Sequence, residues 1–397
     1  MGVRSLPPLI RPYTTSSGTV SILKQKLSSH YHSLDPDLPL RVHEQVAAQE
    51  LTWLEQHARS QGYGSGNWQT KLSHLVDSII KDHKPLAYIL GELDNFTLRV
   101  RAETDGEKRE VGSQPFHPLP VDLLVRPPIL VPRPETEHWV LHLSQTILSS
   151  VDFTASSTSS DSPTTQRKFR ILDIGTGSGC IALGLSQSLL PSQETPTETR
   201  TGLRLETIAI DQSPLAVELA RENAERCSLG ETVSVHQMDL FSEDFVTSVK
   251  RLGGGGGGAE GEGEAFDLVV SNPPYITKKE YEGLDLSVKN WEDRKALVGE
   301  LPFSSPGGGE AEKGAGEGRD DGLIFYRKIT SILDDLLANK DQKQGRGGGQ
   351  HRPPNVAFEV GKGQAQEVGK MLRSRGYKAE IVSDPWGVER AVFGWKP

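Results

Sequence analysis

The clearest chemical signal in the chain is a four-residue turn, Asn272-Pro273-Pro274-Tyr275, which directly follows a short apolar run at residues 268–271. Such a run, rich in β-branched residues, is typical of a buried parallel strand. Consecutive prolines lack N–H donors and fix φ, so the chain must leave the sheet in a stiff turn. Open α/β sheets bind ligands just beyond the carboxyl ends of their strands. We therefore expect this turn to face a ligand site.

The turn carries groups suited to holding a planar nitrogen. The side-chain oxygen of Asn272 and the backbone carbonyl of Pro273 can both accept hydrogen bonds from one –NH2 group. The face of Tyr275 can pack on a planar amide or base. Together these groups would direct the nitrogen lone pair at an electrophile. An ordinary proline-rich turn closing a strand has the same sequence, so the interpretation depends on a methyl-donor site upstream.

A glycine-rich turn lies between a predicted strand at residues 169–174 and a predicted helix. It consists of Gly175, Thr176, Gly177, Ser178 and Gly179. Glycine lets the backbone approach a ligand closely, and the helix N-terminus offers unpaired N–H groups. The spacing is Gly-x-Gly-x-Gly, not the dinucleotide pattern Gly-x-Gly-x-x-Gly. The turn favours a nucleotide-like ligand, although strand-to-helix turns also use glycine for structural reasons alone.

Two further predicted strands end in acids. The strand at residues 205–211 ends at Asp211, where an acid in two-strand nucleotide sites accepts both ribose hydroxyls. Its distance from Gly175 exceeds the usual ~20 residues, but removing the polar insertion at residues 191–202 brings it close. The next strand ends at Asp239, which can accept from an adenine amino group or cap a turn. We favour the ribose role for Asp211 over a helix cap and leave both roles open for Asp239.

Residues 129–137 predict the start of a helix. Pro134 suits the first helical turn, and Glu135 and Glu137 complement the helix dipole there. The segment has two interpretations: it is only a helix start, or it places Arg133 and Thr136 at the mouth of a cofactor site.

Composition narrows the class of protein. Of the 397 residues, 41 are glycine and 25 are proline, and the chain contains five low-complexity insertions. A formal net charge of −9 argues against a broad nucleic-acid surface. The chain has only two cysteines, Cys180 and Cys227, which we expect to be small residues of the core. Two cysteines give neither a disulfide framework nor a metal site, and their low number is consistent with a reducing compartment. No apolar run is long enough to cross a bilayer, so we expect no membrane partner.

The chain is expected to contain four parts. Residues 1–36, basic and rich in Ser and Thr, predict a disordered N-terminus that fits a mitochondrial transit segment. Residues 37–95 predict a helical domain, and residues 96–130 a linking β-hairpin with an insertion. In residues 131–397, strands and helices alternate, which predicts an α/β fold with a doubly wound, mostly parallel sheet and an antiparallel edge.

Together, these features resemble the release-factor glutamine methyltransferase (HemK/PrmC) family, which belongs to the class I S-adenosylmethionine-dependent methyltransferases. The resemblance covers the chain from about residue 40 to the end, except for the insertions. The matching segments, in order, are residues 85–92 with Phe96, 129–137, 173–183, 272–275, 321–327, and Gly387 with Arg390. This ordered set is specific, whereas Asn-Pro-Pro-Tyr alone also occurs in adenine-N6 enzymes.

The resemblance implies a seven-stranded Rossmann-like methyltransferase sheet with a small N-terminal helical domain that docks the substrate. It further implies transfer of a methyl group from S-adenosylmethionine to N5 of the glutamine in the Gly-Gly-Gln loop of a peptide-chain release factor. The site residues it implies are Gly175, Thr176, Gly177, Ser178 and Gly179 for the methionine part of the cofactor, Asp211 for its ribose, Asp239 and Leu240 near its adenine, and Asn272, Pro273, Pro274 and Tyr275 for the glutamine, with Asn272 also beside the cofactor. Many relatives have tryptophan where this chain has Leu240.

Two other functions fit parts of the sequence. An adenine-N6 nucleic-acid methyltransferase would share the turn at Asn272, but we find no Lys/Arg cluster to bind nucleic acid. A catalytically inactive binding scaffold would share the fold, but the glycines, Asp211 and Asn272 are all present. We expect a monomer in the mitochondrion or, without a functional transit segment, in the cytoplasm.

Overall fold

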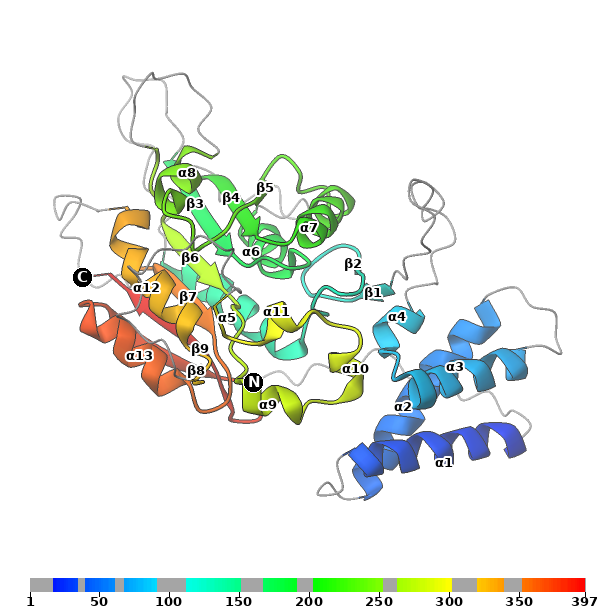
Figure 1. Ribbon diagram of the computed structural model, residues 1–397. Helices are drawn as coiled ribbons and strands as arrows, with labels where there is room; N and C mark the ends of the chain where they lie inside the picture. Colours follow the sequence, from blue (N-terminus) through cyan, green and yellow to red (C-terminus); the bar gives the residue numbers. More distant parts are fainter. Residues whose placement is uncertain are drawn as a thin grey trace. The chain divides into compact units, whose positions relative to one another are not determined.

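The computed structural model describes residues 17–34, 40–60, 68–90, 112–150, 167–190, 203–252, 263–301, 320–338 and 352–396 (Figure 1). The chain divides into two compact units, which we describe separately. Unit 1 comprises Met1–Glu107 and Asp285–Asn290, and unit 2 comprises Lys108–Leu284 and Trp291–Pro397. The border between the two units lies at residues 107/108. The sequence predicted the borders of the linking β-hairpin at 95/96 and 130/131.

Unit 1 is built from helices. They are α1 (Ser17–Leu34), α2 (Leu40–Ser60), α3 (Trp68–Asp82), α4 (Leu86–Leu90) and α10 (Leu286–Lys289). The first three pack around a core to which α1 contributes Leu23 and Leu27, both buried. The prediction of a disordered N-terminus up to residue 36 is therefore wrong from Ser17 onward. Val20, Leu23, Leu27 and Tyr31 recur at helical spacing, and burying this face stabilises the helix despite its polar composition.

Unit 2 contains a seven-stranded sheet in the order β5-β4-β3-β6-β7-β9-β8. Its strands are β3 (Arg167–Ile174), β4 (Leu203–Asp211), β5 (Val233–Gln237), β6 (Leu268–Ser271), β7 (Val356–Glu359), β8 (Lys378–Ser383) and β9 (Glu389–Trp395). The first five strands in this order are parallel, and β9 runs antiparallel to both of its neighbours. The predicted fold class and its antiparallel edge are confirmed.

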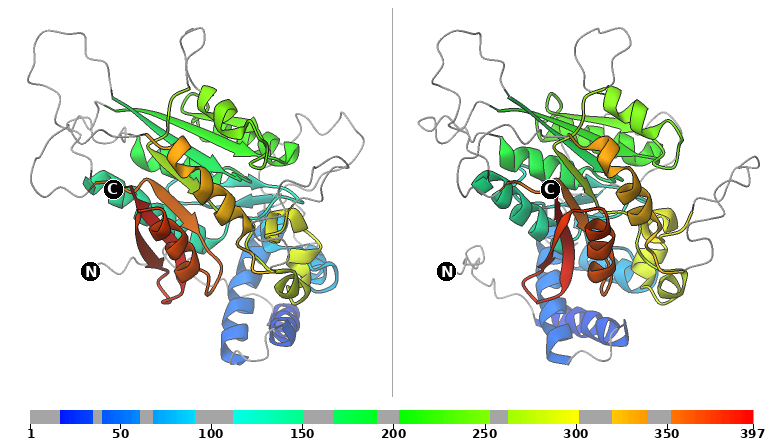
Figure 2. Two further views of the ribbon diagram at one scale, coloured as in Figure 1. Left: turned by 60° about the vertical axis from the view of Figure 1, so that its left-hand side comes forward. Right: turned by 90° about the vertical axis from the view of Figure 1, so that its left-hand side faces the viewer.

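Helices cover both faces of this sheet (Figure 2). Helices α5 (Pro134–Ser150), α6 (Cys180–Leu189) and α7 (Pro214–Arg226) share one apolar cluster, and α8 (Phe245–Arg251), α12 (Ile324–Leu336) and α13 (Ala365–Ser374) share the other. Successive strand residues alternate between the clusters, as Ile171 and Leu172 do on β3. This two-sided burial explains why the strands are continuous apolar runs.

The smaller elements of unit 2 lie in its connections. They are the antiparallel pair β1 (Gly112–Gln114) and β2 (Leu123–Val125), and the short helices α9 (Lys278–Glu282) and α11 (Arg294–Leu297). The pair β1–β2 supplies the predicted hairpin, while the strand signal at Leu98 and Val100 lies outside the described residues. The low-complexity insertions also lie largely outside them, each between two consecutive elements. Cys180 and Cys227 are buried free thiols, as expected.

None of the helices in the described ranges has the length and apolar character required for a membrane span.

Candidate active site

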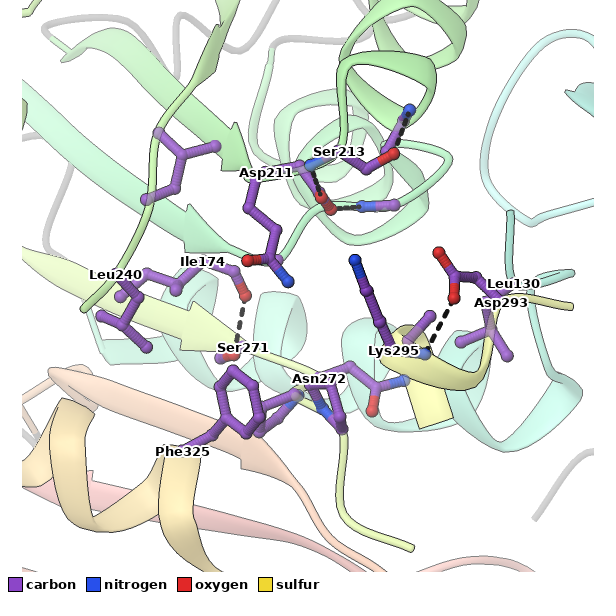
Figure 3. A pocket seen from close by; sticks show the side chains of 18 of the residues that line it. Leu130, Ile174, Asp211, Ser213, Leu240, Ser271, Asn272, Asp293, Lys295 and Phe325 are labelled. Carbon is purple, nitrogen blue, oxygen red and sulfur yellow. Dashed lines mark hydrogen bonds between the residues drawn. The ribbon is translucent and has the colours of Figure 1, made fainter. Parts of the chain in front are cut away.

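A cavity of about 380 Å³ opens at the carboxyl ends of the central parallel strands (Figure 3). The adjacency of β4, β3 and β6 brings the ends of these strands together, although they are far apart in sequence. Eight predicted site residues line the cavity: Gly175, Gly177, Asp211, Asp239, Leu240, Asn272, Pro273 and Pro274. Four predicted residues do not: Thr176, Ser178, Gly179 and Tyr275.

The glycine turn divides into residues that face the cavity and residues that hold the turn. A Cβ placed on Gly175 or Gly177 would meet no protein atom within 4 Å, so both leave room for a ligand. Thr176 and Ser178 are buried instead. A Cβ on Gly179 would lie 3.2 Å from Leu183 Cδ1. Of the five residues predicted to line the cofactor, only Gly175 and Gly177 line the cavity, and the other three pack within the turn.

Asp173, the penultimate residue of β3, stabilises the glycine turn by hydrogen bonds. Its Oδ2 accepts hydrogen bonds from Thr176 Oγ1 at 2.7 Å and from the Ala182 N–H at 3.2 Å, while Oδ1 has no partner among the described residues. Complete burial raises the pKa of Asp173 to about 7, although both hydrogen bonds act in the opposite direction. A charged carboxylate at this position therefore costs stability near neutral pH.

We predict that Asp173→Asn changes the pH dependence of stability. Between pH ~4 and ~7 the unfolded chain releases this proton and the folded chain keeps it, so this group lowers the free energy of unfolding as the pH rises. Asparagine keeps an oxygen acceptor but does not titrate. In urea unfolding, the free energy of unfolding of the variant relative to that of the wild type should rise by a few kcal/mol between pH 5 and pH 8. Parallel pH profiles for the two proteins would contradict this interpretation.

Asp211 links the ends of β3 and β4 at the cavity. Its Oδ2 accepts from the Gly177 N–H at 3.0 Å, and its Oδ1 accepts from the Ser213 N–H at 2.9 Å. Burial raises the pKa of Asp211. Each oxygen retains a second lone pair, and the side chain lines the cavity, so the carboxylate can still accept from two ribose hydroxyls.

Removing this carboxylate should weaken cofactor binding. For Asp211→Ala we expect affinity for S-adenosylhomocysteine to fall on the order of a hundredfold, because two hydrogen bonds to a charged acceptor are lost. Asp211→Asn keeps one acceptor oxygen and should show a smaller loss. Isothermal titration calorimetry measures both values. Wild-type affinity in the alanine variant would exclude the ribose role.

The end of β5 provides an apolar wall. Asp239 Oδ1 accepts from the Phe241 N–H at 2.9 Å, so this residue caps a turn while also lining the cavity. Leu240 is buried beside it. Phe241 and Phe325 meet edge-on, with ring centroids 5.3 Å apart, and both line the cavity. Sequence reasoning assigned no role to either ring, although Phe325 belongs to one of the family-like segments.

The proline turn reaches the cavity only in part. Asn272, Pro273 and Pro274 line it, but Tyr275 does not. The Tyr275 carbonyl accepts from Gln364 Nε2 at 2.9 Å, and a Cβ on Gly361 would lie 2.8 Å from the tyrosine ring. The prediction that Tyr275 contacts the target amide therefore finds no support in the lining of the cavity. The hydrogen bond from Gln364 ties its backbone to the segment after β7.

Arg133 and Thr136, which the sequence predicted at the mouth of the cofactor site, form hydrogen bonds with buried carboxylates. Arg133 Nη2 donates to both carboxylate oxygens of Glu292, each at 2.7 Å. Thr136 Oγ1 donates to the buried Glu359 at 2.6 Å. Neither Arg133 nor Thr136 lines the cavity. The interpretation of residues 129–137 as a helix start is confirmed, and the placement of Arg133 and Thr136 at the mouth of the cofactor site stays a prediction.

The cavity residues fit S-adenosylmethionine. Open space above two glycines, a carboxylate with free lone pairs and an apolar wall match its methionine, ribose and adenine parts. The sheet and this site define a class I S-adenosylmethionine-dependent methyltransferase.

Comparison with known proteins specifies the family. A release factor glutamine methyltransferase of Bacillus cereus is 30% identical over 267 residues, which cover 67% of this chain and 68% of the relative. The corresponding Geobacter sulfurreducens protein is 30% identical over 295 residues, 74% of each chain. The chain belongs to the release factor glutamine methyltransferase family.

The chain also resembles a solved structure, at lower identity. A solved release factor-specific protein-(glutamine-N5) methyltransferase from Alicyclobacillus acidocaldarius is 21% identical and covers 67% of this chain and 95% of its own, with a TM-score of only 0.29. No protein-family model matches the chain.

Proposed function

We propose that this chain methylates N5 of the glutamine in the Gly-Gly-Gln loop of a peptide-chain release factor. The observation that carries the proposal is that Asn272 and Pro273 line the same cavity as Gly177 and Asp211. An amide-binding turn and a cofactor site therefore share one space, as methyl transfer requires. The names of the relatives supply the substrate class.

The proposed chemistry relies on hydrogen-bond acceptors. An amide nitrogen is a weak nucleophile because its lone pair is delocalised into the carbonyl. Asn272 Oδ1 and the Pro273 carbonyl would accept both N–H bonds, favour charge build-up on the nitrogen and fix its direction. When bound, S-adenosylmethionine supplies the electrophilic methyl group.

The proposal requires no strong general base. Among the described residues that line the cavity, none is a histidine or a glutamate. The amide proton becomes acidic only as the new bond forms, so it can leave after the transfer. Tyr275 contributes by holding the turn in place rather than by contacting the amide.

We also propose that unit 1 docks the release factor and that the enzyme works as a monomer. Any mitochondrial address would have to lie before Ser17, because losing α1 would expose the apolar core of the unit. Hydrogen exchange with and without a release factor should show protection in residues 17–90, and light scattering should give the mass of one chain. Unchanged exchange throughout unit 1 would contradict the docking role.

Transfer of labelled methyl groups tests the function. The protein is incubated with labelled S-adenosylmethionine and, separately, with a release factor, the same factor with Gly-Gly-Ala, DNA and RNA. We expect label only in the unaltered release factor. Label in nucleic acid would favour adenine-N6 methylation, and label nowhere, despite cofactor binding, would favour a binding scaffold.

A further inference from the structure

The side chain of Gln364 joins three segments at the end of the proline turn. Its Nε2 donates to the Tyr275 carbonyl at 2.9 Å and to the Asp321 carbonyl at 3.1 Å, and its Oε1 accepts from the Gly361 N–H at 3.0 Å. Tyr275 ends the turn, Asp321 lies shortly before α12, and Gly361 lies shortly after β7. Gln364 itself is the N-cap residue of α13, and sequence reasoning assigned it no role.

A side-chain amide satisfies all three partners at once. Its oxygen faces an N–H donor and its nitrogen faces two carbonyl acceptors, so turning the amide over would place acceptor against acceptor. A carboxylate at position 364 would have no proton for either carbonyl. The carboxylate of Asp321 is already held by Arg327 Nη1 at 3.0 Å and by the Leu323 N–H at 3.1 Å. These contacts therefore require a group that both donates and accepts.

The proline turn is fixed at both of its ends. At its start, Ser271 Oγ donates to the Ile174 carbonyl at 2.7 Å. At its far end, Gln364 holds the Tyr275 carbonyl. The two prolines between these ends fix φ, so a shift of one end moves the whole turn. Asn272 lines the cavity and Gln364 does not, so Gln364 can influence the reacting amide only through the turn.

The space around the end of the turn is closely packed. A Cβ on Gly361 would lie 2.8 Å from both Gln364 Oε1 and Tyr275 Cδ2. Just beyond the turn, the N–H of Lys278 donates to Asp320 at 2.7 Å, which ties the start of α9 to the segment before α12. Interiors packed in this way transmit a displacement instead of absorbing it.

We propose that Gln364 is a positioning residue for methyl transfer, which holds the Tyr275 carbonyl so that the acceptors of Asn272 and Pro273 face the target nitrogen. The inference rests on the proposed function, because that function defines the reacting nitrogen. Gln364 contributes through the distance and angle at which the two acceptors meet the amide, and such placement controls the rate of the chemical step.

Gln364→Glu replaces the donor by an acceptor of the same shape. At pH 8 the carboxylate faces two carbonyl oxygens, so kcat should fall about a hundredfold, the cost of a ~1 Å displacement. The same surroundings should raise the pKa of the new carboxyl above that of an exposed glutamate. At pH 5.5 its protonated form can donate to one carbonyl again. The ratio of the kcat of the variant to that of the wild type should therefore rise about tenfold between pH 8 and pH 5.5.

Two further variants make this result specific. Gln364→Met keeps the length of the side chain but has no strong donor and no charge, so its kcat should fall about tenfold at both pH values. Gln366→Glu places the same charge on an exposed position of α13 and should leave kcat unchanged. The Gln364 side chain makes no cap hydrogen bond to α13, so that helix should persist in every variant. Calorimetry should show wild-type affinity for S-adenosylhomocysteine throughout.

Wild-type kcat in both Gln364 variants would overturn the proposal. So would a loss in Gln364→Glu that is the same at pH 8 and pH 5.5, because a general loss of structure would not be relieved by one proton. If the glutamate variant does not fold, the comparison of Gln364→Met with the wild type decides: a lower kcat at unchanged cofactor affinity supports positioning, and a wild-type kcat contradicts it.

Hydrogen exchange tests the same contact without a release factor. Amides of residues 275–284 should exchange about tenfold faster in Gln364→Glu than in the wild type at pH 8, and the difference should narrow at pH 5.5. Unchanged exchange at pH 8 would show that Gln364 does not hold the turn. Faster exchange in a protein that leaves release factors unmodified would support the anchoring of the turn and contradict only the proposed methylation.

Discussion

Asn272→Ala should strongly slow methyl transfer to a release factor while leaving the affinity for S-adenosylhomocysteine nearly unchanged. Asn272 lines the cavity beyond β6, whereas the carboxylate assigned to the ribose stands at the end of β4. Losing one acceptor aimed at the reacting nitrogen should lower kcat by about 10²–10³-fold, the size typical of a single transition-state hydrogen-bonding group. Single-turnover assays and calorimetry measure the two quantities separately.

Gln366→Ala is the matched control for this substitution. Gln366 is an exposed side-chain amide on α13 in unit 2 and does not line the cavity, so its replacement should alter neither kcat nor affinity. A wild-type rate for Asn272→Ala would remove the central acceptor from the proposed chemistry. A large loss of S-adenosylhomocysteine affinity in that variant would instead assign Asn272 mainly to the cofactor.

Gly322→Ala should reduce kcat on the order of a hundredfold through a shift of the proline turn. Gly322 has φ of +66°, and a Cβ there would lie 1.9 Å from the Tyr275 carbonyl oxygen and 2.9 Å from Gln364 Nε2. Gln364 Nε2 itself donates to that same carbonyl and, at 3.1 Å, to the Asp321 carbonyl. The added methyl group must therefore displace the end of the turn, and a displacement of ~1 Å at a reacting centre can cost about 10²-fold.

The control separates this clash from backbone strain. Gly376 also has a positive φ, +86°, but a Cβ there would meet no atom within 4 Å. Gly376→Ala should cost about 1 kcal/mol in the free energy of unfolding and leave kcat unchanged. If both variants lose stability equally and neither loses activity, the turn does not depend on its contact with Gly322.

The parts of the site that were predictable are those coded locally. Buried strands are continuous apolar runs, so the ends of β3, β4 and β6 were visible in the sequence. The residues at or just past those ends, Gly177, Asp211 and Asn272, all line the cavity. Parallel strands of one sheet share an edge, which brings such residues together whatever the length of the insertions between them.

The parts that were missed depend on contacts between distant segments. The charges of Asp293 and Lys295 reach the cavity because the backbone of α11 is tied to Pro128 and Glu292 is tied to Arg133, and no local pattern records these bonds. The backbone carbonyl of Tyr275 accepts from Gln364, 89 residues later, which no local pattern records either. Helix α1 was missed because its polar composition outweighed four apolar residues at helical spacing.

Tandem mass spectrometry of a release factor incubated with the enzyme and S-adenosylmethionine tests the central claim most directly. We expect one added methyl group on the side-chain nitrogen of the glutamine in Gly-Gly-Gln, accumulating about 10²–10³-fold more slowly when Asn272→Ala replaces the wild-type enzyme. A methyl group on any other residue of the factor, or an unmodified factor in the presence of cofactor-binding enzyme, would contradict it.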